Sequence, residues 1–180
     1  MLLFCRGMPY NYGKMPIKYE KAGDLQEQIN EIARVLFPHV KLDSVVCLRS
    51  FGSTSRGTIA RCHALGKAMQ LALGRKGFYV IEAISSRFDR LSKEEQIKTL
   101  IHELMHIPKS FGGGFIYHNV VCHKNVERMY EKYICLKKRI SKDLRDYSFS
   151  NLIENKNKYE ENSGDADEFI VKKPKRGFWF

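Results

Sequence analysis

Five consecutive residues near the middle of the chain, His102-Glu103-Leu104-Met105-His106, combine the side chains that a catalytic zinc site requires. On a helix, His102 and His106 lie one turn apart, about 6 Å along the axis, so both imidazoles can bind one tetrahedral zinc ion. Glu103 then lies beside the ion, where it can take a proton from a zinc-bound water and later give it to the leaving amine. The motif therefore predicts hydrolysis of peptide bonds by zinc-activated water, with Glu103 as general base.

A catalytic zinc ion takes a third protein ligand, and His118 is the leading candidate for this place. The glycine run at 112–114 lies between His106 and His118 and lets the chain turn sharply back toward the motif. Three rivals also follow the glycine run and carry side chains that bind zinc: His123, Glu127 and Glu131.

Four other side chains with suitable chemistry receive no role. His39 and His63 have no ligand-spaced neighbour and read as surface or half-buried histidines. Tyr79 and Tyr117 can in principle donate a hydrogen bond to a developing oxyanion, but aromatic residues beside a strand and a loop more often serve packing. The predicted strand at 78–84 is a candidate to hold an extended substrate by main-chain pairing, provided that it lies at a sheet edge.

The motif requires a helix, and the sequence around it predicts one. Ser92 and Glu95 match the S-x-x-E capping box, which marks a helix start. Pro108 places the helix end near Ile107. The apolar face of this helix consists of Ile97, Leu100, Ile101 and Leu104.

The remaining pattern predicts an α+β domain, in which a small sheet precedes the motif helix and an amphipathic helix follows it. A first helix begins at Asp24 as N-cap and ends before Pro38; its apolar positions are Leu25, Ile29, Ile32, Ala33 and Leu36. Strands are expected at 45–48, 58–63 and 78–84, and the closing helix at 119–140. Residues 1–23 show no periodicity and read as a loose arm.

The expected domain organisation is a loose N-terminal arm at 1–15, a metallopeptidase-sized domain at 16–140 and a polar tail at 141–180 with a basic, aromatic end. Met15 is an alternative translation start to Met1. Apolar residues make up 43% of the chain and charged residues 28%, which is usual for a folded domain.

Net charge and cysteine content suggest candidate partners and a cellular compartment for the protein. The net charge of +11 makes nucleic acid a candidate partner beside a protein or peptide substrate. Five cysteines without a C-x-x-C pair, and without a signal peptide, indicate a reducing cytoplasm. No apolar run reaches the roughly 18 residues of a membrane span, so no membrane partner is expected.

Several segments together resemble a metallopeptidase family of archaea and phages. The similarity covers roughly residues 16–138 and includes the Phe111-x-Gly-Gly segment with the following His118. The resemblance implies a zincin-like fold, with His102, His106 and His118 as zinc ligands and Glu103 as catalytic residue. The segments that carry it are Leu48-Arg49-Ser50, Gly52-Ser53, Ser55-Arg56, Tyr79 to Glu82, Arg87 to Ser92 and Ile101 to Lys109.

The order of elements is more loosely similar to SprT-like and Spartan proteases, which act on proteins attached to DNA. The chain has no paired cysteines downstream of the motif, so it lacks the zinc ribbon of many SprT-like proteins, and Met105 stands where leucine is commoner. Two alternatives to a general metallopeptidase therefore remain: a protease of DNA-associated proteins, and a non-catalytic metal-binding interaction module.

Overall fold

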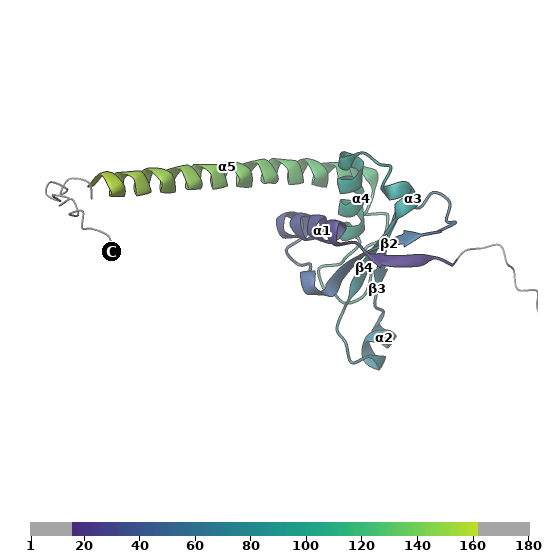
Figure 1. Ribbon diagram of the computed structural model, residues 1–180. Helices are drawn as coiled ribbons and strands as arrows, with labels where there is room; N and C mark the ends of the chain where they lie inside the picture. Colours follow the sequence, from purple (N-terminus) through teal and green to yellow (C-terminus); the bar gives the residue numbers. More distant parts are fainter. Residues whose placement is uncertain (1–15, 162–180) are drawn as a thin grey trace, which may run out of the picture. The chain divides into compact units, whose positions relative to one another are not determined.

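The computed structural model describes residues 16–161, and the side chains of residues 16–143. It contains two compact units: the first ends at Leu136, and the second begins at Lys137. The predictions for the arm at 1–15 and for the basic, aromatic end lie outside the described residues. The first unit carries the sheet and the motif helix (Figure 1).

The first unit is built on a mixed four-stranded sheet in the order β1-β2-β4-β3. Strands β2 and β4 run parallel, and the two outer strands pair antiparallel with them. The strands are β1 (Lys18–Lys21), β2 (Val45–Phe51), β3 (Ala60–Ala64) and β4 (Tyr79–Ile84). The α+β class is thus confirmed.

The sheet corrects one sequence-based expectation and decides a second point that the sequence had left conditional. Residues 18–21 are not part of a loose arm, because they pair with β2 in the register Lys18 to Phe51. Strand β4 cannot offer an edge to a substrate, because β2 and β3 flank it on both sides. Both differences come from strand pairing between distant segments, which local patterns do not record. The edge strands are β1 and β3.

Two helices, α1 (Gly23–Leu36) and α4 (Lys93–Met105), pack beside each other on one face of the sheet, α1 against β2 and α4 against β3 (Figure 1). All five apolar positions predicted for α1 are buried. In α4, Leu100, Ile101 and Leu104 are fully buried. The burial of apolar side chains between these helices and the sheet forms the core that holds the motif helix in place.

Asp24 does not cap α1. The helix begins at Gly23, and the cap residue Ala22 makes no side-chain hydrogen bond. The Asp24 carboxylate instead accepts two hydrogen bonds from the Arg49 guanidinium, at 2.6 and 2.7 Å. This paired contact holds the pKa of Asp24 at about 2, well below its usual range. The main partner of this carboxylate is thus a charged side chain on β2.

The closing helix α5 (His123–Glu161) begins four residues later than predicted and continues well beyond Ile140. In the first unit, Val126 and Tyr133 of α5 are buried in the core. The short helices are η1 (Leu42–Ser44), α2 (Lys67–Ala72) and α3 (Ser85–Phe88). No helix within 16–161 is both long and apolar enough to cross a bilayer.

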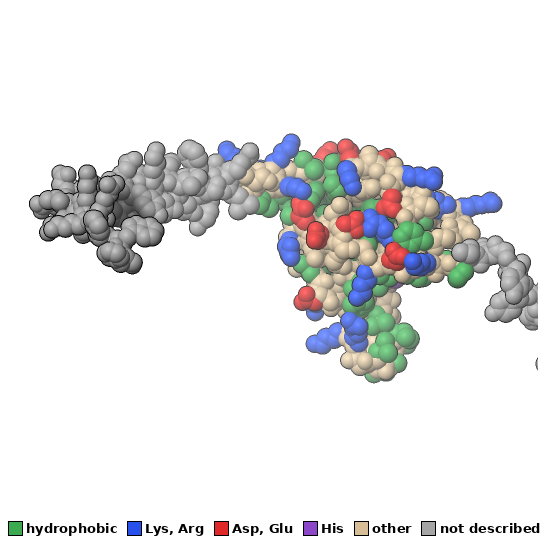
Figure 2. All heavy atoms as spheres, viewed as in Figure 1, with side chains coloured by type: hydrophobic (Ala, Val, Ile, Leu, Met, Phe, Trp, Pro, Cys, Tyr) green, Lys and Arg blue, Asp and Glu red, His purple; other side chains and the backbone are tan. Residues whose placement is uncertain are grey.

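The charge is mixed on the one face that Figure 2 draws. On the face drawn in Figure 2, Lys and Arg side chains alternate with Asp and Glu rather than forming one basic patch. Nucleic-acid binding, which the net charge of +11 suggested, therefore finds no support in this view.

Candidate metal centre

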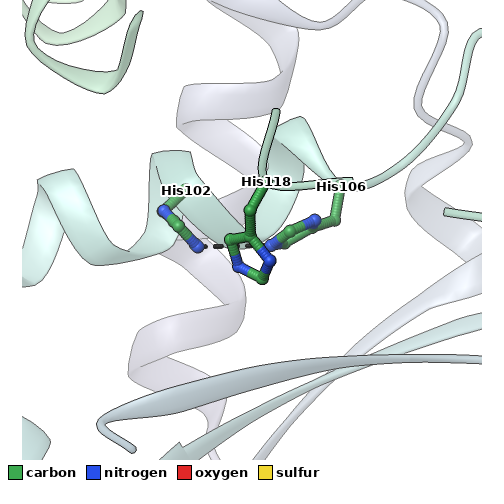
Figure 3. Close-up of side chains that lie close together, drawn as sticks. All are labelled: His102, His106 and His118. Atoms are coloured by element: carbon green, nitrogen blue, oxygen red, sulfur yellow. Dashed lines mark hydrogen bonds between the residues drawn. The ribbon is translucent and has the colours of Figure 1, made fainter. Parts of the chain in front are cut away.

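Three histidines converge at one place in the first unit (Figure 3). His102 lies on α4, His106 is the C-cap residue of this helix, and His118 comes from the loop that follows. One ring nitrogen from each lies within 4.8 Å of the others. The sequence placed these three residues in one site, and the structure brings them together.

The spacing of the first two histidines suits a zinc ion. The Nε2 atoms of His102 and His106 lie 3.2 Å apart. Tetrahedral coordination with Zn–N bonds of about 2.0–2.1 Å places two ligand nitrogens about 3.3–3.4 Å apart. The separation of this pair is thus close to that of two ligands of a tetrahedral ion, and the ligand atom of His118 lies within 4.8 Å of both.

The helix that holds this pair is well defined. Ser92 caps α4 with the predicted capping box. Its hydroxyl accepts a hydrogen bond from the Glu95 amide, and the Glu95 carboxylate accepts one from the Ser92 amide at 3.0 Å. The buried side chains of Ile101, just before the motif, and of Leu104, within it, fix the rotation of the helix about its axis. Both histidines line a cleft beside the helix, and His106 is largely buried, with an exposed fraction of 9%.

A backbone carbonyl orients the second histidine. The Nδ1 atom of His106 lies 2.6 Å from the Ile116 carbonyl oxygen, so Nδ1–H donates to it and Nε2 is left for the metal. The Ile116 amide donates back to the His106 carbonyl at 2.9 Å. These two contacts join the end of α4 to the loop that carries His118.

The surroundings of His102 and His106 favour the neutral imidazole, which is the form that binds metal. Burial, followed by the proximity of His106 and His118, lowers the pKa of His102 to about 4. Burial also lowers the pKa of His106, although its contact with the Ile116 carbonyl acts in the opposite direction. These two imidazoles therefore favour binding a metal cation over binding a proton.

Glu103 is the buried acid of the site, with an exposed fraction of 6%. Burial raises the pKa of its carboxyl to about 7, and a hydrogen bond from the Cys62 backbone amide partly offsets this rise. A carboxyl group with such a pKa can both accept and release a proton near neutral pH.

Two clefts meet at the histidines, with volumes of about 730 and 500 Å³. Both are lined by the start of β3 and by the centre of the site, and the residues common to both are Thr58, Ala60, His102, Glu103 and His118. The larger cleft continues along α4 toward Lys98 and Val126, and the smaller one continues along β3 toward His63. An open path thus runs past the site beside an edge strand.

The other side chains that the sequence singled out lie outside the histidine cluster. The rival ligand His123 is 90% exposed in its side chain and faces Glu127 at 3.5 Å; Glu127 also pairs with Lys98. Neither His123 nor Glu127 nor Glu131 joins the three histidines. His39 contacts the Ile107 carbonyl, and His63 pairs with the buried Glu82, so these two histidines have partners elsewhere.

The two tyrosines differ in their surroundings. Tyr79 is fully buried, and its hydroxyl is bound to the backbone of the glycine run, so it is not free to stabilise an oxyanion. Tyr117 is 76% exposed and lines the smaller cleft. Sequence reasoning missed the Cys62 amide and the Ile116 carbonyl, because a backbone group carries no residue-type signal.

The glycine run contains one position that only glycine fits. Gly113 has φ +83°, and a Cβ atom there would lie 2.2 Å from the Leu65 carbonyl oxygen. Gly113→Ala is therefore expected to reduce the free energy of unfolding by at least about 2 kcal/mol, from backbone strain and steric conflict together. It is also expected to weaken zinc binding, because the loop to His118 must shift.

Gly114→Ala is the matched control for this substitution. A Cβ atom at Gly114 meets nothing within 4 Å. Its effect on chemical denaturation should stay within about 0.5 kcal/mol. Equal free energies of unfolding for the two alanine variants would show that the backbone conformation of Gly113 does not contribute to stability.

A family model described as "Putative phage metallopeptidase" matches residues 17–148, which is more than half of the chain. The match includes the sheet, the motif helix and the three histidines, and it confirms the family resemblance seen in the sequence. No curated protein matches the chain, and neither does any solved structure.

Proposed function

Because the chain belongs to the phage metallopeptidase family, we propose that it is a zinc-dependent peptidase with a zincin-like active site. His102, His106 and His118 are the proposed zinc ligands, and Glu103 is the proposed general base. The observation that carries this proposal is the convergence of three imidazole nitrogens within 4.8 Å beside a buried glutamate.

The donor set supports a catalytic site over a closed structural one. Among the described residues, only these three histidines group around the centre, which leaves one place of a tetrahedral shell for water or substrate. When bound, zinc lowers the pKa of a coordinated water toward neutrality and polarises the scissile carbonyl. The non-catalytic module requires a fourth protein ligand, which this part of the chain does not supply.

Glu103 is suited to proton transfer rather than to metal binding. Its carboxyl is buried, its pKa is about 7, and the Cys62 amide fixes one side of the group. It lines both clefts, so it borders the place where a scissile bond would lie. We infer that Glu103 takes a proton from the attacking water and gives it to the leaving amine.

The substrate is proposed to be a protein or peptide segment in extended form. Strand β3 borders the site and is an edge of the sheet, so its free side can pair with a substrate backbone. The two clefts then accept side chains on either side of the scissile bond. This role falls to β3 and not to β4, which the sequence had suggested.

Removal and return of the metal test the proposal directly. Treatment with a zinc chelator is expected to abolish cleavage of casein, and one equivalent of zinc should restore it. Metal content and cleavage are measured on the same sample before and after dialysis. Cleavage that persists after the metal content falls to zero would exclude a metallopeptidase. Zinc binding without cleavage of casein or varied peptides would favour the non-catalytic module.

A further inference from the structure

The loop between α4 and α5 carries His118, whose side chain is exposed and whose ring contacts are with His102 and His106. The backbone that precedes His118 decides where this side chain can reach. The contacts with His106 hold this backbone at Ile116. A second set of contacts holds it at the glycine run.

Tyr79 supplies the central contact of this second set. Its hydroxyl accepts a hydrogen bond from the Gly113 amide and donates one to the Gly114 carbonyl, both at 3.0 Å. It therefore binds consecutive residues of the loop with both its donor and its acceptor function.

The ring of Tyr79 is itself held rigidly. Tyr79 opens β4, the strand flanked on both sides, and its exposed fraction is zero. Phe111 and Phe115, at the two ends of the glycine run, pack edge-on against it with centroid distances of 4.9 and 6.4 Å. The hydroxyl is thus a fixed point of the sheet core that reaches into the loop.

Gln70 adds a contact from α2. Its amide nitrogen donates to the Gly112 carbonyl at 3.0 Å and to the Leu65 carbonyl at 2.6 Å. Close backbone approach completes the arrangement, because a Cβ atom at Gly77 would lie 2.2 Å from the Phe111 carbonyl oxygen. Three consecutive residues of the loop, 112–114, are therefore held by the side chains of Gln70 and Tyr79.

We propose that Tyr79, assisted by Gln70, is the positioning residue for the third metal ligand: it fixes the glycine run so that His118 lies near His102 and His106 before any metal binds. The proposal rests on the proposed function of the three histidines as metal ligands. Its physical basis is preorganisation, since a ligand that is already in place loses less conformational entropy when the metal binds. Outer-shell groups that orient ligands typically account for 10- to 100-fold in metal affinity.

Tyr79→Phe keeps the ring and removes only the hydroxyl, so it isolates the two hydrogen bonds. We expect its zinc dissociation constant to rise by about 10- to 100-fold over wild type. The matched control is Tyr133→Phe, because Tyr133 is also buried and its hydroxyl donates to Glu31 at 2.8 Å. The control is expected to lower the melting temperature of the metal-free protein to a similar degree, with an unchanged zinc dissociation constant.

Zinc affinity is measured by competition with a chromophoric chelator, and stability by thermal unfolding of the metal-free proteins. A zinc dissociation constant of Tyr79→Phe equal to that of wild type or of Tyr133→Phe would overturn the proposal. If Tyr79→Phe cannot be purified, Gln70→Ala must by itself weaken zinc binding severalfold, and unchanged affinity in that variant would also overturn it. Failure of wild type to bind zinc would refute the proposed function instead, and with it the basis of this proposal.

Discussion

Glu103→Gln is expected to lower kcat/KM for peptide hydrolysis by about 10²- to 10⁴-fold while zinc stays bound. The amide has nearly the same shape as the carboxyl, but it can neither accept the proton of the attacking water nor deliver it to the leaving amine. Glu103 is not one of the clustered metal-binding side chains, so its replacement leaves the histidines in place. The protein should also remain stable, because the variant no longer buries an ionisable group.

The measurement combines metal content, unfolding temperature and initial rates on one peptide. The control is Glu94→Gln, on the same helix, whose side chain is 55% exposed and pairs with Lys98 on the surface. This control should cleave at the wild-type rate. Wild-type activity in Glu103→Gln would remove Glu103 from the mechanism and, with it, the peptidase proposal in its present form.

His118→Ala is expected to weaken zinc binding by more than about 100-fold, which exceeds the usual effect of an outer-shell change. The variant retains His102 and His106, whose Nε2 atoms lie 3.2 Å apart, but two imidazoles alone hold zinc weakly. Because His118 is exposed, its removal should change the stability of the metal-free protein by no more than about 0.5 kcal/mol. Loss of affinity would then report on metal ligation and not on folding.

His123→Ala is the matched control for this experiment, since His123 is the rival histidine nearest in sequence and is 90% exposed in its side chain. It should bind zinc as wild type does. The reverse outcome, with affinity lost in His123→Ala and retained in His118→Ala, would assign the third ligand to His123. A titration with a competing chelator at fixed pH distinguishes these results.

The sequence by itself determined the parts of the site that depend on neighbours along the chain. His102, Glu103 and His106 are related by helical spacing, and the capping box at Ser92 and the apolar face of α4 lie in the same short segment. For the same reason, the sequence correctly predicted the burial of all five apolar positions of α1. Helical hydrogen bonds join residues four apart, so residue types within one segment suffice to predict them.

Only the tertiary structure decided the features that join distant segments. It pairs residues 18–21 with β2, places β4 inside the sheet and leaves β3 as the edge beside the site. It brings His118, and not the rivals, to the motif, through contacts that Tyr79, Gln70 and His106 make with the loop. Many of these contacts use backbone amides and carbonyls, which every residue has. Residue type therefore marks the two proposed ligands of the motif, whereas the position of the third depends on how the chain returns to them.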